Sequence, residues 1–265
     1  MDSALILKKL SRLKMPGIAE TLDHRLGQAV AEKWSYSTLL EMLLTDEIER
    51  RNHKQLTIRL SKSRLDQSKT IETFNFEFNT AIPAPLIREL CSCAFIEKKQ
   101  NLFFLGQSGC GKSHLAQALG HEACRREQDV LHYCTYQLLD WIHSGRGDGT
   151  HKRRLAQVVK TQVLILDDFG LQPMNGAQQD DLYQIIAERY EKKSTIITSN
   201  RDISEWSSIF ANPLLGTAAV DRLVHRGIQV AIEGPSYRLE EFKKMCAKTN
   251  KNVIISETKG KQKKV

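Results

Sequence analysis

The sequence of 265 residues lacks several features that would place it in a large class of proteins. No apolar run approaches the roughly 20 residues that a membrane-spanning helix needs. The first residues, MDSALILKK, are amphipathic and do not have the charged and then apolar order of a signal peptide. No internal repeat is visible. We therefore expect a folded cytoplasmic protein that does not use a membrane as a partner.

The six cysteines do not form the CxxC pairs of a zinc site. Cys91 and Cys93 are separated by one residue, and the others are scattered. This spacing favours reduced thiols. The alternative is a redox role for Cys110, which lies inside the glycine-rich segment described below and would control access to it.

Acidic residues are also scarce relative to basic ones, so the formal net charge is +8. This excess favours a polyanionic partner. It is concentrated in residues 50–69, where Asp66 is the one acid and the basic residues are Arg50, Arg51, Lys54, Arg59, Lys62, Arg64 and Lys69. A second basic stretch begins after residue 240 and is rich in lysine.

A phosphate-binding loop is the most informative pattern. Residues 106–113 read GQSGCGKS and match GxxxxGK(S/T), in which backbone N–H groups surround phosphates while a lysine and a hydroxyl reach the phosphates and magnesium. An apolar strand at residues 102–105 precedes the loop, and residues 114–126 can continue as a helix. The predicted nucleotide contacts are Gly106, Gln107, Ser108, Gly109, Cys110, Gly111, Lys112, Ser113 and His114.

A second segment, VLILDD at residues 163–168, is an apolar strand that ends in two carboxylates. Asp167 is suited to hold magnesium, usually through water, and Asp168 to orient and deprotonate a water molecule. The alternative is an ordinary polar strand end. The phosphate loop about 50 residues earlier favours the functional interpretation.

Two further candidates follow in the chain. Residues 195–199 predict a strand that delivers Asn200 to the carboxyl edge of the sheet, where ligands bind in open α/β folds. Arg222, in the sequence Asp221-Arg222-Leu223, lies on a predicted short helix and is suited to stabilise transition-state charge on a neighbouring subunit's nucleotide. The alternatives are a turn or helix cap for Asn200 and a surface ion pair for Arg222.

The order of elements predicts an α/β fold with a five-stranded parallel sheet between helices, preceded by a small all-helical domain. We expect strands at residues 102–105, 130–134, 163–166, 195–199 and 228–232. Helical periodicity covers residues 5–65, and an extended connector is expected at residues 68–79. Its Phe74, Phe76 and Phe78 either contact an adenine ring or seal the connector onto the core. The predicted domains are 1–68, 69–242 and a flexible tail, 243–265.

These motifs together resemble the AAA+ ATPases of the initiator and helicase-loader type, related to DnaC. More closely, the chain resembles the IstB family, which are ATP-binding transposition helpers of bacterial insertion sequences. The segments that carry this resemblance are LKKLSRLKMPGIAETL from Leu7, FNFEFN in the connector, LILDDFGLQP from Leu164, IITSNRDISEW from Ile196, AAVDRLVHRG from Ala218, and GPSYR ending at Arg238. The resemblance extends to about Phe242.

The resemblance implies ATP and Mg²⁺ as cofactors, with Lys112 on the β- and γ-phosphates and Ser113 and Asp167 serving magnesium. It also implies that Asp168 polarises water, that Asn200 is the sensor, and that Arg222 is a finger supplied in trans in a homo-oligomer. Two features depart from the AAA+ pattern: the second acid is Asp where many members have Glu, and no helical lid is visible after Glu233. Arg238 is a weak candidate for a sensor arginine in cis.

The implied partners are duplex DNA, contacted largely without sequence preference, and a cognate transposase in a bacterial cytoplasm. Candidate DNA contacts are Arg50, Arg51, Lys54 and Arg59, together with Lys152, Arg153 and Arg154 in the segment that faces nucleic acid in loaders and initiators. The alternative is a solvated basic surface. For the whole protein, the alternatives are a replicative helicase loader and a nucleotide-gated DNA-binding scaffold with vestigial hydrolysis. A small-molecule P-loop kinase is disfavoured, because it would not explain the basic segments.

Overall fold

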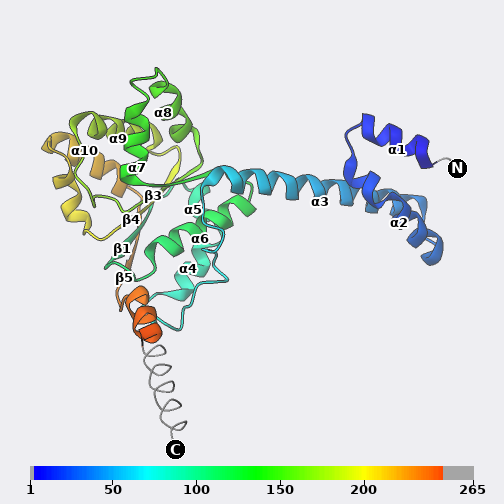
Figure 1. Ribbon diagram of the computed structural model, residues 1–265, viewed down its shortest axis with the longest axis horizontal. Coiled ribbons are helices and arrows are strands. Elements are labelled where there is room, and N and C mark those ends of the chain that lie inside the picture. Colours follow the sequence, from blue (N-terminus) through cyan, green and yellow to red (C-terminus); the bar gives the residue numbers. More distant parts are fainter. Residues whose placement is uncertain (1–2, 247–265) are drawn as a thin grey trace, which may run out of the picture. The chain divides into compact units, whose positions relative to one another are not determined.

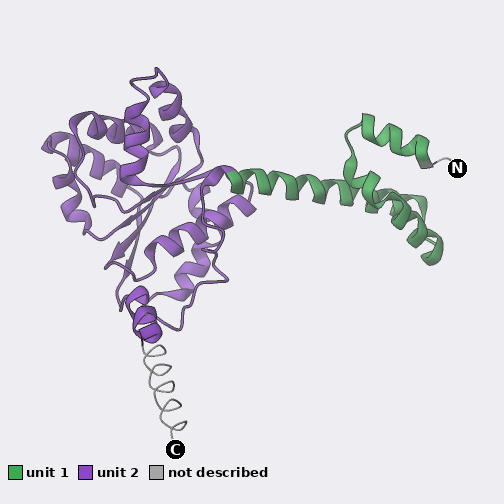
Figure 2. Ribbon diagram, in the orientation of Figure 1, with its two compact units in different colours: residues 1–61 green, residues 62–265 purple. Residues whose placement is uncertain are grey.

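The computed structural model describes residues 3–246 (Figure 1). The chain divides into two compact units, residues 1–61 and residues 62–265, which Figure 2 shows in green and purple. The predicted boundary at residue 68 therefore lies inside the second unit. None of the described helices combines the length and apolar character that would let it cross a membrane.

The first unit is helical, as predicted. It contains α1 (Ser3–Arg12), α2 (Pro16–Glu32) and most of α3 (Tyr36–Ser63), whose last two residues belong to the second unit. Its buried core is small and consists of Ile18, Leu22 and Leu43. Several leucines that contribute to the helical periodicity of residues 5–65 are exposed instead, and these include Leu13, Leu40 and Leu44. Helical periodicity therefore identified the helices but overestimated how much of them is buried.

A buried carboxylate fixes the start of α2 in this unit. Glu47 on α3 is only 4% exposed, and its Oε2 accepts hydrogen bonds from the backbone N–H groups of Gly17 (2.6 Å) and Ile18 (3.3 Å). These are N–H groups that the helix itself leaves without partners. The other oxygen, Oε1, accepts from Nε of Arg51 at 2.7 Å. A Cβ atom at Gly17 would lie 2.8 Å from Cα of Glu47, so the two helices approach closely only because this residue is glycine.

The second unit is built on a five-stranded sheet with the order β2-β3-β4-β1-β5. The strands are β1 (Leu102–Gly106), β2 (Val130–Cys134), β3 (Val163–Asp167), β4 (Ser194–Ser199) and β5 (Ile228–Ile232). All four strand pairings are parallel, which confirms the predicted sheet. Leu105 of β1 pairs with Ser199 of β4, and Leu166 of β3 pairs with Ile197, so these strands end at one edge.

Helices cover both faces of the sheet (Figure 1). One side carries α4 (Ala84–Leu90), α5 (Ala94–Glu97) and α6 (Lys112–Arg125). The other side carries α7 (Thr135–Ser144), α8 (His151–Lys160), α9 (Gly176–Arg189) and α10 (Pro213–Val224), together with the 3-10 helix η1 (Ile203–Ile209). The resulting three layers bury β1, β3 and β4 along almost their whole length, as expected for a parallel sheet covered on both faces.

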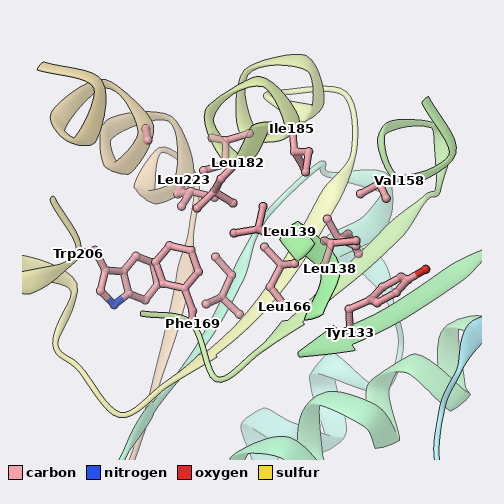
Figure 3. Close-up of a cluster of buried hydrophobic side chains, with 14 of the residues drawn as sticks. Tyr133, Leu138, Leu139, Val158, Leu166, Phe169, Leu182, Ile185, Trp206 and Leu223 are labelled. Atoms are coloured by element: carbon pink, nitrogen blue, oxygen red, sulfur yellow. The ribbon is translucent and has the colours of Figure 1, made fainter. Parts of the chain in front are cut away.

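The core on the α7 to α10 side anchors the end of β3. Figure 3 shows Phe169 beside the indole of Trp206, and their ring centroids are 4.8 Å apart. Both side chains are almost fully buried, at 1% and 0% exposure. Because Phe169 directly follows Asp168, the packing of its ring fixes the backbone on which the second acid is carried.

The structure differs from the sequence analysis in two segments outside the sheet and its flanking helices. Residues 68–79 form successive turns and not an extended connector, because their own side chains bond the backbone: Oδ1 of Asn75 accepts from the N–H groups of Glu77 and Phe78, and Oγ1 of Thr73 donates to the carbonyl of Ser68. A helix covers residues 237–246, which the sequence analysis did not identify, although no helical lid domain was predicted after Glu233. The first four residues of the predicted flexible tail belong to it, whereas residues 247–265 lie outside the described part of the chain.

Candidate nucleotide and magnesium site

The phosphate loop joins β1 to α6 and depends on glycine at three positions, the first of which is Gly106, where a Cβ atom would lie 2.0 Å from the carbonyl oxygen of Ile232. Gly109 and Gly111 have φ values of +84° and +101°, which side chains rarely adopt. A Cβ atom at Gly109 would lie 2.1 Å from Oγ of Ser236, and one at Gly111 would lie 2.9 Å from the ring of Phe74. The loop is therefore closely covered by segments from before β1 and after β5.

Lys112 opens α6 and its side chain is held within the loop. Nζ donates hydrogen bonds to the carbonyls of Gly106 (2.8 Å) and Gln107 (2.7 Å), and it lies 3.8 Å from Sγ of Cys110. Burial lowers the pKa of Lys112, and the nearby acid Asp168 partly offsets this effect. The ammonium group is thus placed at the mouth of the loop, where a phosphate would gain most from it. All six cysteines lie within residues 3–246, and no disulfide joins any of them in this part of the chain.

Asp167 ends β3 and is held by hydroxyl groups from two other elements. Its Oδ1 accepts a 2.8 Å hydrogen bond from Oγ of Ser113 and a short one from Oγ1 of Thr198. Burial acts to raise the pKa of Asp167, but its contacts with His132, Thr198 and Ser113 outweigh burial and lower the pKa. The group is therefore a carboxylate at neutral pH.

Asp168 differs from its neighbour in backbone and in electrostatics. Its φ is +54°, a left-handed conformation that is unfavourable for a residue with a side chain. The conformation is held because its N–H donates to Oγ1 of Thr198 (3.1 Å), and the next N–H, that of Phe169, donates to the Thr198 carbonyl (2.9 Å). Burial and the adjacent charge of Asp167 raise the pKa of Asp168. A carboxylate with a raised pKa is a better proton acceptor.

These groups surround one cavity of about 600 Å³. It brings together the predicted residues from three separate segments of the chain, which are Ser108, Gly109, Cys110, Gly111, Lys112, Ser113, His114, Asp167, Asp168 and Asn200. Gly106 and Gln107 are not in its lining, although their carbonyls hold Lys112. The volume is in the usual range for small-molecule sites.

Aromatic rings form another wall of this cavity. Phe74 lies edge-on to His114, with centroids 5.1 Å apart, and Phe78 lies edge-on to Tyr237 at 4.9 Å. Phe74, Phe78 and Tyr237 line the cavity, whereas Phe76 packs on Phe74 and does not. Flat apolar surfaces therefore stand beside the phosphate loop, where the base of a bound nucleotide needs them.

The oxygen groups present suit magnesium. The Ser113 hydroxyl and the Asp167 carboxylate are in direct contact, and hard oxygen ligands are those that magnesium prefers. Among residues 3–246, no group of three or more His, Cys, Asp or Glu side chains is arranged to hold a metal ion. A magnesium ion here would consequently be held by these two side chains together with water and the phosphates of its nucleotide.

Of the two candidate arginines, one lines the cavity and the other does not. Arg222 on α10 is not part of the lining; its Nη1 donates to the carbonyl of Ala218, and its guanidinium lies over the ring of Tyr183, 5.4 Å from the centroid. Arg238 does line the cavity, and its charge acts to lower the pKa of Asp168. The helix at 237–246 starts against the loop, because the N–H of Tyr237 donates to the carbonyl of Gly109.

The candidate DNA contacts in the first unit are of two kinds. Arg50 is paired with Glu20, and Arg51 with the buried Glu47 and the carbonyl of Lys14. Lys54 is exposed and Arg59 is half-buried. The two arginines therefore have a structural task inside the unit.

The candidate contacts in the second unit also differ from one another. Arg154 is held by Asp148 (2.7 Å), by Oγ of Ser144 (2.8 Å) and by the face of the Trp141 ring. It thus braces the loop between α7 and α8. Lys152 and Arg153, on the first turn of α8, are exposed to solvent.

Two residues that contact the acids were missed by the sequence analysis. Thr198 forms hydrogen bonds with both acids. The sequence could have indicated it, because Thr198 lies on a predicted strand two residues before Asn200, and side chains two residues apart on a strand point to the same face. His132 on β2 lies with Nε2 3.6 Å from Oδ2 of Asp167. No local pattern marked it, because the pairing of β2 with β3 is a property of the folded sheet.

Comparisons with known proteins agree with the fold and with ATP binding. The family described as IstB-like ATP binding protein matches residues 8–245. A Pseudomonas aeruginosa relative named for insertion sequence IS21 and for ATP binding is 36% identical over 248 residues, which is 94% of each chain. The crystal structure of the DnaC helicase loader matches with a TM-score of 0.50 and 26% identity, covering 56% of this chain and 87% of that one.

The AMPPCP-bound structure of DnaA from Aquifex aeolicus matches with a TM-score of 0.55 at 22% identity, covering 71% of this chain and 57% of that one. At this level of identity the likeness concerns the fold alone. The five-stranded parallel sheet, its phosphate loop and its flanking helices are those of an AAA+ P-loop protein. On the family match across residues 8–245, the chain belongs to the IstB-like ATP-binding proteins of insertion sequences.

Proposed function

We propose that this protein is a DNA-dependent ATPase that assembles on duplex target DNA, remodels it and recruits a partner transposase in the bacterial cytoplasm. The observation that carries the proposal is the convergence of Lys112, Ser113, Asp167, Asp168 and Asn200 on one cavity. Relatives named for insertion sequences and ATP binding support it.

In the proposed reaction, water attacks the γ-phosphate of ATP, and ADP and phosphate leave. Lys112 would neutralise charge on the β- and γ-phosphates, and Asp168 would accept the proton of the attacking water, which Asn200 helps to orient. Magnesium, when bound through Ser113 and Asp167, supplies charge neutralisation at the phosphates. The shorter reach of Asp168, compared with the Glu of many AAA+ proteins, is expected to give slow turnover that suits a timed switch.

We further propose that Arg222 serves the nucleotide of a neighbouring subunit. Its absence from the lining of its own cavity is compatible with a role in trans. Mixing Arg222→Ala subunits with Lys112→Ala subunits should then restore part of the turnover, because some interfaces combine an intact loop with an intact arginine. No recovery between subunits that demonstrably mix would remove Arg222 from this role.

DNA binding is proposed to use basic residues whose side chains are exposed or half-buried. Lys54 in the first unit and Lys152 and Arg153 in the second are exposed, and Arg59 in the first unit is half-buried. Contacts to phosphates position a protein without reading the base sequence, which suits a factor that accepts many targets.

The decisive experiment measures ATP turnover with and without duplex DNA, together with the assembly state in ATP and in ADP. We expect DNA to accelerate turnover, and ATP to favour the larger assembly. Turnover no higher than that of Lys112→Ala at saturating DNA would instead support a nucleotide-gated scaffold.

The likeness to the DnaC helicase loader supports a second candidate, a loader of a replicative helicase. A binding assay that offers both a cognate transposase and a replicative helicase separates the two functions. Capture of the helicase alone would contradict transposase recruitment.

A further inference from the structure

His132 is a partly buried polar side chain that the proposed chemistry does not use. It lies on β2 with 17% of its side chain exposed, and its Nε2 faces Oδ2 of Asp167 at 3.6 Å. The opposite oxygen, Oδ1, is already occupied by the hydroxyls of Ser113 and Thr198. The two oxygens of this carboxylate are thus contacted from two different sides.

The imidazole is supported from behind. Its Nδ1 lies 3.4 Å from the carbonyl of Arg64, the residue that follows α3. Arg64 is itself fixed, because its guanidinium lies over the ring of Tyr133, 4.4 Å from the centroid. Two residues further on, the N–H of Asp66 donates to Gln117 on α6, and the Asp66 carbonyl is bonded by His121. The backbone behind His132 is therefore held on the same helix that carries Lys112 and Ser113.

His132 is not part of the lining of the nucleotide cavity. It therefore has no direct route to the phosphates or to an attacking water. Whatever it does for the reaction has to act through Asp167. The distance of 3.6 Å is longer than a hydrogen bond, so the contact restrains the carboxylate through packing and electrostatic attraction. Nδ1 faces the Arg64 carbonyl and Nε2 faces the carboxylate, so both contacts are attractive together when each ring nitrogen carries a proton.

We propose that His132 is a positioning residue for the magnesium acid, holding the Asp167 carboxylate in one rotational orientation between β2 and the phosphate loop. The inference rests on the proposed function in taking Asp167 as the acid that serves magnesium. Residues that contact a metal-binding carboxylate from behind commonly set its orientation, and their loss costs about 10- to 100-fold in metal affinity or activity.

Three substitutions separate orientation of Asp167 from simple filling of space. His132→Gln keeps an amide N–H near the position of Nε2, His132→Asn keeps one near Nδ1 and faces Arg64, and His132→Phe keeps the ring without nitrogen. Tyr133→Phe, on the next position of the same strand, is the matched control, because the Tyr133 hydroxyl is buried with no hydrogen-bond partner in the structure.

The measurement is the magnesium concentration needed for tight binding of a fluorescent ATP analogue, followed by kcat and KM at saturating magnesium. We expect His132→Phe and His132→Asn to need about tenfold more magnesium, with His132→Gln close to the wild type. Binding of the analogue without magnesium should be unchanged in every variant, which verifies that each is folded. Tyr133→Phe should match the wild type throughout.

A wild-type magnesium requirement in His132→Phe would overturn the proposal, since the ring alone would then suffice. Equal behaviour of His132→Asn and His132→Gln would also overturn it, because only the glutamine reaches Asp167. The wild type could bind the nucleotide in a magnesium-dependent manner and yet show no turnover. That result would contradict the proposed ATPase activity, but the binding measurements would still test the role of His132. No effect of magnesium on wild-type binding would overturn both.

Discussion

The hydroxyl of Ser113 donates a 2.8 Å hydrogen bond to Oδ1 of Asp167, although the two residues are 54 positions apart in the chain. This bond connects the first turn of α6 to the end of β3 and so joins the phosphate loop to the acids. A structural change in either segment therefore alters the same part of the cavity. The two acids that follow one another in the sequence nevertheless have opposite pKa shifts, lowered for Asp167 and raised for Asp168.

Lys112→Ala and Asp168→Asn should separate nucleotide binding from turnover. Lys112 contacts the loop itself, so its loss should weaken ATP binding, whereas Asp168→Asn should retain binding and assembly and lower kcat by about 100-fold or more through loss of the proton acceptor. Titration with a fluorescent ATP analogue and a steady-state phosphate assay report the two properties. Equal loss of binding in both variants would refute this division of roles.

The basic residues at the start of α8 should respond differently to mutation. The double variant Lys152→Ala and Arg153→Ala should weaken duplex DNA binding and reduce the salt dependence by about two phosphate contacts, with unchanged thermal stability. Arg154→Ala should lower stability by about 1 kcal/mol, because Arg154 braces the α7–α8 loop through Asp148 and Trp141. Binding isotherms at several salt concentrations and thermal melting test both. Loss of stability in the double variant would contradict the assignment.

Gly17 and Gly27 lie on the same helix and make a matched pair. A Cβ atom at Gly17 would lie 2.8 Å from Cα of Glu47, whereas one at Gly27 would have nothing within 4 Å. Gly17→Ala should therefore destabilise the first unit by about 1–3 kcal/mol through overpacking, and Gly27→Ala should stabilise it by about 0.5–1 kcal/mol through helix propensity. Amide hydrogen exchange across residues 16–32 measures both. Similar effects of the two variants would show that the contact with Glu47 is unimportant.

The first unit should also depend on pH through Asp46. Two hydrogen bonds from Arg25, at 2.6 and 2.8 Å, lower the pKa of Asp46 to about 2. A lowered pKa in the folded state means that the carboxylate stabilises the fold above the ordinary pKa of about 4, and that this stabilisation is lost as the pH falls toward 2.

Replacing Arg25 by Met should therefore lower the stability of the first unit at neutral pH, and the difference from the wild type should close between about pH 4 and pH 2. The measurement is amide hydrogen exchange in α2, compared between the two proteins at each pH. Because both proteins are compared at the same pH, the effect of acid on the intrinsic exchange rate is the same in both. A difference that persisted at pH 2 would mean that packing of the Arg25 chain, and not the ion pair, is responsible.

The sequence by itself determined the elements whose causes are local. The glycine-rich loop, the apolar run before Asp167, and the five strand segments depend on residues that are neighbours in the chain, so pattern and spacing were sufficient to predict them. The parallel arrangement followed as well, because strands separated by helices pair in parallel.

Tertiary structure decided which side chains meet. The placing of β2 beside β3 brings His132 to Asp167, and the turn after β5 brings Arg238 to the cavity, since contacts between distant segments leave no periodic signal in either one. Folding also gave Arg154 an acidic partner and left Lys152 in solvent, although the two were equivalent in the sequence. Charge can be counted from composition, but its availability to a partner depends on which opposite charges the fold places beside it.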